Sequence, residues 1–249
     1  MALRARILGG GATGEVWLMP EGFVEKRAWS HKDAKEDLKT EARVYKLLAE
    51  NFDVQERFLK FFDYKPDIGK LSLEFMECGT LRDYLKAHAQ IAYSQRAAWS
   101  RELTQGLQML HSISIIHMDL TPANMLLNLN LELKIADFAC SSVGGSNPSG
   151  TGSVRFYPEV TVTFKDDIFA AGSSMYEIFT NDSPCKEICS SQVVELYSMN
   201  RFPALSDTSI AGTEMANIIR DCWMRRIDSA AHLAKQVEQA SRNEDVNGR

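Results

Sequence analysis

The sequence predicts an α+β fold of two lobes, in which a small antiparallel β-sheet with one helix precedes a larger, mainly α-helical part. Short strand-like segments joined by glycine and proline turns lie on both sides of one helical segment within residues 1–76. Apolar residues recur at helical spacing through most of residues 80–241. We therefore expect a single domain with a hinge at about 74–79, a cleft between the lobes and a polar tail at 242–249.

The smaller lobe should begin with three antiparallel strands within residues 3–26, because β-favouring residues flank the turn Pro20-Glu21-Gly22. Residues 33–51 then carry apolar positions at helical spacing among charges, which predicts one amphipathic helix. Two further strands are expected at 58–64 and 71–76. They complete an antiparallel sheet and not a βαβ unit.

The larger lobe is predicted from helical periodicity alone. Within it, residues 141–153 hold four glycines and five serines, which predicts a mobile loop. The expected helices are 81–89, 95–112, 167–180, 191–199, 214–224 and 229–241.

Composition excludes several classes of protein. The formal net charge is -5 and the basic residues are dispersed, which argues against a nucleic-acid surface. No apolar run approaches the roughly 20 residues of a membrane span. Five cysteines without a CxxC pair or His at metal spacing argue against a disulfide framework or a zinc site. We expect a cytoplasmic protein without nucleic-acid or membrane partners.

Glycines recur as Gly9, Gly11 and Gly14 in the pattern G-x-G-x-x-G-x-V, which begins after Leu8 and ends at Val16. Positions without a side chain let backbone N–H groups approach phosphates. Taken alone, the pattern is equally that of an ordinary glycine-rich hairpin. A dinucleotide-binding fold is disfavoured, because a strand and not a helix follows Gly14.

Lys26 lies on the strand expected to run beneath this hairpin, where its ammonium group is able to reach nucleotide phosphates. Most strand lysines are instead exposed to solvent. A glutamate of the helix at 33–51 could fix Lys26 by a charge-assisted hydrogen bond. Glu41 is the candidate, although Glu36 and Glu50 lie on the same helix.

The most specific pattern is His117-x-Asp119-x-x-x-x-Asn124, followed by Asp137-Phe138-Ala139. A hydroxyl that attacks a γ-phosphate needs a carboxylate to orient it and accept its proton, and Asp119 suits that role. Mg²⁺ prefers hard oxygen ligands, which Asn124 and Asp137 provide. These residues predict phosphoryl transfer.

With these segments in order, the chain resembles the eukaryotic-type protein kinase family, whose catalytic loop reads H-R-D-L-x-x-x-N and whose metal-binding triplet reads D-F-G. Tyr157-Pro158-Glu159 stands where the family has A-P-E, and Asp167 to Gly172 is similar to its D-x-x-x-x-G helix start. Cys222-Trp223 is similar to a late pair in tyrosine and tyrosine-kinase-like domains. The likeness runs from Gly9 to about Leu233. It implies the two-lobed kinase fold, ATP and Mg²⁺ as cofactors, and Ser/Thr residues of proteins as substrates.

The resemblance also assigns the nucleotide contacts. Leu73 would lie at the back of the ATP pocket, and the segment Glu74 to Met76 would hydrogen-bond the adenine. Val16 and Val24 would cover the base from above, with Leu126 beneath it. The catalytic positions fall on Lys26, Glu41, Asp119 and Asn124, and the metal positions on Asn124 and Asp137.

Four positions depart from the family pattern. Met118 replaces an arginine that pairs with a phosphorylated activation loop, so we expect activity without such phosphorylation. Thr121 replaces a lysine that contacts the transferring phosphate, which predicts slow turnover. The run Thr121-Pro122-Ala123 does not match tyrosine kinases either. Ala139 restricts the backbone of the D-F-G segment, and Val24 narrows the adenine site.

A fifth departure concerns Glu159, whose usual arginine partner falls at Ala230. An unpaired buried carboxylate is costly. We therefore expect Arg225 or Arg226 to pair with Glu159 if Glu159 is buried.

Two other functions stay open. A pseudokinase would keep the fold as a nucleotide-binding or scaffolding module, which the departures favour and the retained lysine and acidic positions oppose. A small-molecule phosphotransferase of the aminoglycoside or choline kinase type also uses an H-x-D-x-x-x-x-N loop. Those enzymes lack counterparts of Tyr157-Pro158-Glu159 and of Asp167 to Gly172.

Overall fold

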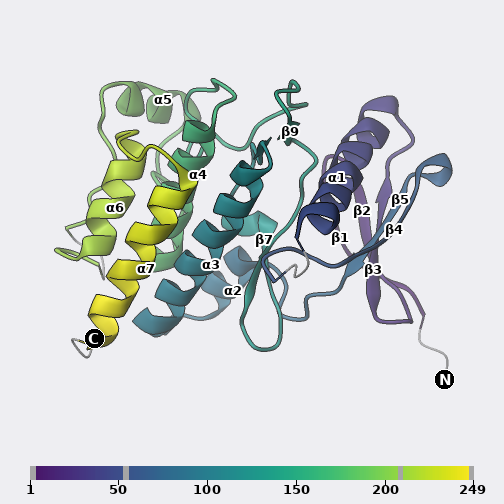
Figure 1. Ribbon diagram of the computed structural model, residues 1–249, viewed down its shortest axis with the longest axis horizontal. Coiled ribbons are helices and arrows are strands. Elements are labelled where there is room, and N and C mark those ends of the chain that lie inside the picture. The colour runs from purple at the N-terminus through teal and green to yellow at the C-terminus, as the bar shows by residue number, and fades with distance from the viewer. Residues whose placement is uncertain (1–3, 53–55, 207–209, 247–249) are drawn as a thin grey trace.

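The structure is a computed structural model that describes residues 4–52, 56–206 and 210–246. It has a smaller lobe built on a sheet and a larger helical lobe, which lie on the right and left of Figure 1. The predicted α+β class is confirmed. None of the helices in those ranges is long and apolar enough to span a bilayer.

The smaller lobe is a five-stranded antiparallel sheet with the strand order β1-β2-β3-β5-β4. A short 3-10 turn, Pro66–Ile68, connects β4 to β5, and Gly69 follows it in the left-handed conformation that glycine adopts easily. Helix α1 packs on the sheet (Figure 1). The elements are β1 Arg6–Gly10, β2 Gly14–Leu18, β3 Phe23–Ala28, α1 Lys32–Asn51, β4 Phe61–Lys65 and β5 Lys70–Glu74.

Helix α1 begins at a cap that satisfies one of its first N–H groups, because the His31 ring accepts a hydrogen bond from the backbone of Ala34. Leu38, Ala42 and Tyr45 recur at spacings of three and four and are buried on one face. Glu41 lies on that same buried face. The helix therefore brings one carboxylate into the space between the lobes.

The larger lobe is organised around α4, which is buried along most of its length. Helices α3, α6 and α7 pack around it and against one another. The larger lobe also contains two short antiparallel strand pairs, β7 with β8 and β6 with β9. The elements are α2 Leu81–Ala87, α3 Tyr93–Ser112, β6 Ile115–Ile116, the 3-10 turn Pro122–Asn124, β7 Met125–Leu127, β8 Leu133–Ile135, β9 Ser142–Val143, α4 Phe164–Thr180, α5 Ser190–Ser198, α6 Glu214–Trp223 and α7 Ala230–Val246.

Three details differ from the sequence prediction. The strand expected at 58–64 starts only at Phe61, because Phe58 instead bridges to Ile135 of the larger lobe. Helix α7 continues through residues assigned to the polar tail. The glycine- and serine-rich stretch at 141–153 contains strand β9, because Ile115 provides a strand partner that composition does not reveal.

Candidate active site

The glycine hairpin joins β1 to β2 above the space between the lobes. A Cβ added at Gly14 would overlap the carbonyl oxygen of Arg27, so the pairing of β2 with β3 requires glycine there. Gly9 and Gly11 have no atom within 4 Å of an added Cβ and are open. The Trp29 indole N–H donates to the Gly11 carbonyl at 3.0 Å, which fixes the hairpin from outside.

Lys26 is the centre of a three-residue charged cluster. Its ammonium group donates to Glu41 at 2.7 Å and to Asp137 at 2.8 Å. Lys26 lies on β3 and Glu41 on α1, both in the smaller lobe, whereas Asp137 follows β8 in the larger lobe. The contacts of Lys26 therefore join both lobes. The structure thus brings together three predicted site residues and selects Glu41, since Glu36 and Glu50 are exposed.

Burial and charge act in opposite directions on the protonation of this cluster. Burial lowers the pKa of Lys26, but the carboxylates of Asp137 and Glu41 outweigh it and leave that pKa above its ordinary value. Burial raises the pKa of Glu41 to about 7, against the opposing effect of Lys26. Burial also acts to raise the pKa of Asp137, yet the Lys26 charge and hydrogen bond hold it below its ordinary value. Lys26 stays charged and Asp137 ionised at neutral pH.

The residues predicted to surround adenine gather where β5 leads into the hinge. Val24 pairs with Leu73 across β3 and β5, and both are buried. Backbone hydrogen bonds connect the hinge to the larger lobe. The Leu127 N–H donates to the Gly79 carbonyl, and the Leu127 carbonyl accepts from the Cys78 N–H. Leu126 bridges to Thr80 and so lies beneath the hinge.

Three other residues predicted to bind the nucleotide differ in burial. Val16 on β2 is half-buried, Leu8 on β1 is 42% exposed, and Met76 is buried. The carboxylate of Glu74 accepts from Lys134 at 2.8 Å and from the backbone N–H of Lys60 at 2.9 Å. Because the backbone N–H of Glu74 also donates to the Lys60 carbonyl at 2.9 Å, only the backbone carbonyl of Glu74 remains for a nucleotide.

Asp119 follows β6 in an irregular loop, and Asn124 closes the short helical turn after it. The Asn124 amide donates to the Asp119 carboxylate at 2.8 Å and to its carbonyl at 2.9 Å. Burial raises the pKa of Asp119, with a smaller contribution of the same sign from Asp137. A raised pKa strengthens a carboxylate as a proton acceptor near neutral pH.

Asp137 adopts a backbone φ of +62°, and the next residue turns its ring into the core. Phe138 is fully buried, 5.0 Å from the Tyr45 ring and 5.2 Å from the His117 ring between centroids. Tyr45 in turn stacks on Phe61 at 6.5 Å. The four rings form one column that runs from the larger lobe into the sheet.

The donor set suits a hard cation bound with a nucleotide. Asn124 uses its amide N–H group on Asp119, which leaves its carbonyl oxygen as an acceptor. Asp137 commits one oxygen to Lys26 and is 42% exposed. In the described ranges no cluster of three His, Cys, Asp or Glu side chains is suited to a metal ion. Asn124 and Asp137 are the residues that would hold a Mg²⁺ ion.

Asp167, at the start of α4, anchors the loop that carries Asp119. Its carboxylate accepts from the backbone N–H groups of His117 at 2.7 Å and Met118 at 3.1 Å. It also contacts the His111 ring and the Tyr157 hydroxyl. The family resemblance placed Asp167 at the start of a helix. The spacing of the sequence motifs did not predict the hydrogen bond between Asp167 and the Tyr157 hydroxyl.

Glu159 is exposed, so it does not need the ion pair with Arg225 or Arg226 that was expected for a buried carboxylate. Arg225 instead pairs with the fully buried Asp166 at 3.1 Å. Arg226 pairs with Asp221. Arg225 thus pairs with a buried carboxylate and not with the exposed Glu159.

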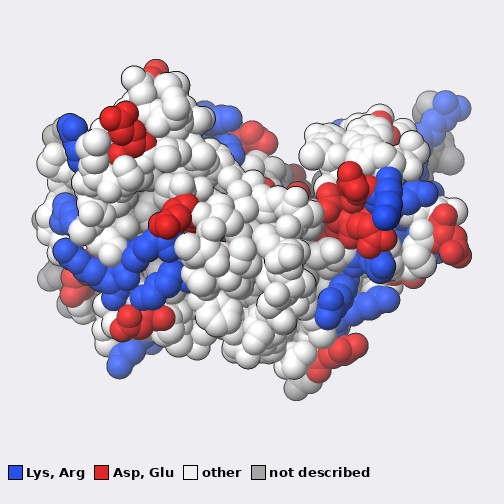
Figure 2. All heavy atoms as spheres, turned by 90° about the horizontal axis from the view of Figure 1, so that it is seen from above, with Lys and Arg blue, Asp and Glu red and all other residues white. Residues whose placement is uncertain are grey.

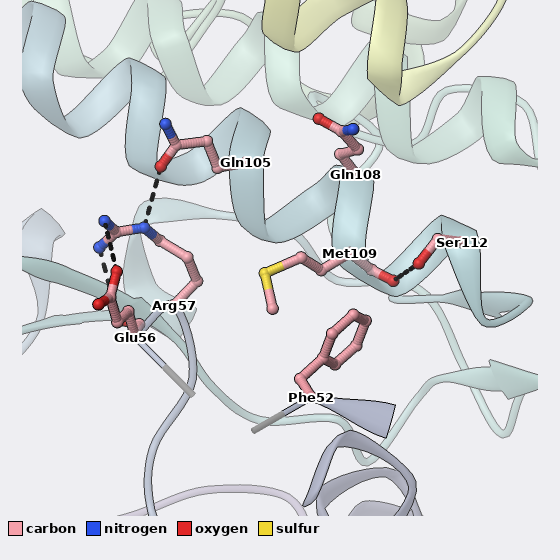
Figure 3. Close-up of a pocket in the computed structure, with 7 residues that line it drawn as sticks. All are labelled: Phe52, Glu56, Arg57, Gln105, Gln108, Met109 and Ser112. Atoms are coloured by element: carbon pink, nitrogen blue, oxygen red, sulfur yellow. Dashed lines mark hydrogen bonds and ion pairs between the residues drawn. The ribbon is translucent and has the colours of Figure 1, made fainter. Parts of the chain in front are cut away.

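A cavity of about 500 Å³ lies elsewhere, between the end of α1 and one face of α3 (Figure 3). Arg57 crosses one side of it and donates to Gln105 at 3.1 Å. None of its lining residues is a predicted site residue. They are Phe52, Glu56, Arg57, Gln105, Gln108, Met109 and Ser112.

The side chains described above lie between the two lobes and form the candidate nucleotide site. Figure 2 shows the outline hollowed between the larger and the smaller lobe. On that face acidic and basic side chains are interspersed.

Comparisons with known proteins agree with this geometry. Residues 4–237 match the family described as "Protein kinase domain". The chain is 31% identical over 172 residues to RGS domain-containing serine/threonine-protein kinase A of Dictyostelium discoideum, covering 66% of this chain and 15% of that protein. It is 29% identical over 231 residues to serine/threonine-protein kinase STE20 of Kluyveromyces lactis, covering 87% and 23%. With the mouse proto-oncogene serine/threonine-protein kinase mos it shares 28% over 176 residues, covering 64% and 51%. The chain thus spans about half or less of the length of these relatives.

Proposed function

We propose, since the chain belongs to the protein kinase family, that it is an ATP-dependent enzyme that transfers the γ-phosphoryl group of Mg-ATP to Ser or Thr hydroxyls of proteins. The observation that carries the proposal is the Lys26 ammonium, held between Glu41 and Asp137 across the two lobes. Positioning and charge stabilisation supply most of the catalysis in phosphoryl transfer.

Each residue has a role that follows from its contacts. Lys26, oriented by Glu41, binds phosphate oxygens beneath the open backbone of the glycine hairpin. Asn124 and Asp137 would hold Mg²⁺, which would neutralise charge on the phosphates. Asp119, oriented by Asn124, accepts a hydrogen bond from the substrate hydroxyl and then takes its proton.

Support for Ser/Thr substrates is less direct. The relatives named above are serine/threonine kinases by name. The Thr121-Pro122-Ala123 run also differs from the tyrosine kinase pattern. The protein substrate itself is left open by both observations.

The test is transfer of radiolabel from Mg-ATP to a generic protein substrate, followed by phosphoamino-acid analysis. We expect Asp119→Asn and Lys26→Met each to abolish transfer, with unchanged circular dichroism. Full activity in either variant would remove that residue from the mechanism. Thermal stabilisation by ATP without any transfer would identify a pseudokinase, and label on a small amine or sugar but never on protein would identify a small-molecule phosphotransferase.

A further inference from the structure

In the loop that carries Asp119, the backbone N–H groups of four consecutive residues, 117–120, each donate a hydrogen bond to a side chain. The N–H groups of His117 and Met118 donate to Asp167. The N–H of Asp119 donates to the His117 ring nitrogen at 3.2 Å. The N–H of Leu120 donates to a side chain outside the loop, the hydroxyl of Tyr157, at 2.9 Å. Hydrogen bonds thus hold the loop on both sides of the carboxylate.

The Tyr157 hydroxyl serves two partners at once. It donates to Asp167 at 2.9 Å and therefore presents its oxygen lone pairs to the Leu120 N–H. Burial, and then the negative charge of Asp167, raise the pKa of Tyr157 well above its ordinary value, so the hydroxyl keeps its proton. Ser174 donates to the Leu120 carbonyl at 2.9 Å. Both backbone groups of the residue after Asp119 are thereby fixed by other segments.

Tyr157 belongs to the segment that leads from the glycine- and serine-rich stretch into α4. That segment is bound to the larger lobe, since Ser173 donates to the Arg155 carbonyl at 2.9 Å. In the A-P-E pattern that this segment resembles, alanine occupies the position of Tyr157 and offers no hydroxyl. An alanine at this position could not make the contact with Leu120 that Tyr157 makes in this chain.

We infer that the Tyr157 hydroxyl is a positioning group for the phosphoryl transfer proposed above, coupling the docked segment at 153–157 to the orientation of Asp119. The inference rests on the proposed function for its catalytic consequence. Its structural consequence, protection of the Leu120 N–H, does not depend on that function. When the segment leaves its place, Leu120 loses its acceptor and Asp167 loses one of its donors.

The test compares Tyr157→Phe, which keeps the ring and removes only the hydroxyl, with the matched variant Tyr197→Phe. Tyr197 is also buried but packs on Phe169 and Phe202, away from the loop. We expect Tyr157→Phe to lower kcat about tenfold, because it removes the hydrogen bonds of the hydroxyl with both Asp167 and Leu120. KM for ATP should stay within about twofold, because the Lys26 cluster is untouched. Tyr197→Phe should leave both constants near those of the wild type.

Amide hydrogen exchange of the segment around Leu120 gives the second readout. Faster exchange there in Tyr157→Phe, but not in Tyr197→Phe, is expected. Unchanged kcat, unchanged exchange at Leu120, or equal losses in the two variants would each overturn the inference. Wild-type protein without any transfer would refute the proposed function instead, and the exchange measurement would still decide whether Tyr157 positions the loop.

Discussion

At the scale of single residues, a glycine, Gly152, lies next to the Asp119 carboxylate. A Cβ added at Gly152 would overlap Asp119 Oδ1 and lie 3.1 Å from the Tyr157 ring. The Gly152 N–H also donates to the Met118 carbonyl at 2.8 Å, so the backbone cannot move away freely. We predict that Gly152→Ala lowers kcat by about tenfold or more by displacing Asp119, with little change in ATP affinity.

Gly150→Ala is the matched control for steady-state kinetics and ATP titration. Its added Cβ would meet only the Cys140 sulfur, at the ordinary contact distance of 3.6 Å. Activity of that variant should remain within about twofold of the wild type. Equal activity of the two variants would show that Gly152 does not constrain Asp119.

The buried carboxyl of Glu41 predicts a pH dependence of stability. Its pKa rises from an ordinary 4.5 to about 7 on folding. Between these values the folded protein binds more protons at this site than the unfolded chain, so its contribution to the free energy of unfolding falls as pH rises. Urea denaturation of wild type and Glu41→Gln should be measured from pH 4.5 to 8. We expect the free energy of unfolding of the wild type to fall relative to that of Glu41→Gln as the pH rises to 7. A difference independent of pH would contradict the raised pKa.

At the scale of elements, the N-terminus of α4 depends on a buried carboxylate. Asp166 accepts hydrogen bonds from the N–H groups of Thr161 and Thr163, both at 3.0 Å, and pairs with Arg225. We predict that Asp166→Ala lowers the free energy of unfolding by about 3–5 kcal/mol, because it leaves a partly buried arginine and two backbone donors unpaired.

Glu159→Ala is the comparison, since the exposed Glu159 is the carboxylate that the family pattern would pair with an arginine. Its effect should stay within about 0.5 kcal/mol. Chemical denaturation of both variants measures the contrast. A larger loss in Glu159→Ala than in Asp166→Ala would restore the arrangement expected from the sequence.

These two carboxylates also show how far the sequence determines the site. Motif spacing predicted Lys26, Asp119, Asn124 and Asp137, and the helical period places Glu41 on the buried face of α1. Which arginine pairs with which carboxylate depends on tertiary packing. Glu159 is exposed and Arg225 pairs with Asp166, so the pairing expected for a buried Glu159 does not arise. Strand β9 was missed for the same reason, because its partner Ile115 lies far from it in the chain.

At the scale of the whole molecule, the lobes are connected through rings as well as charges. The column of Phe61, Tyr45, Phe138 and His117 passes from β4 through α1 to the loop of Asp119. It runs beside the contacts of Lys26 with Glu41 and Asp137. A rotation of α1 away from the cleft would break both sets together, so the position of α1 and the completeness of the site are linked.

The segment between Asp137 and α4 is held in place without phosphate. Val143 pairs with Ile115, the Ser141 hydroxyl donates to the His117 carbonyl, and Arg155 donates to the Cys185 carbonyl at 3.3 Å. Met118, where the family carries a cation for a phosphorylated residue, is fully buried. A phosphate on this segment would therefore find no arginine at position 118 to bind.

We predict from this that phosphatase-treated protein keeps its activity within about twofold of untreated protein, since the segment needs no new ion pair to order itself. Initial rates before and after treatment, with mass spectrometry of residues 141–153, provide the measurement. The variant Ser149→Ala with Thr151→Ala, which removes two exposed hydroxyls of the segment, should behave in the same way. A loss of about tenfold on dephosphorylation, reversed by rephosphorylation, would mean that a basic residue at another position binds the phosphate.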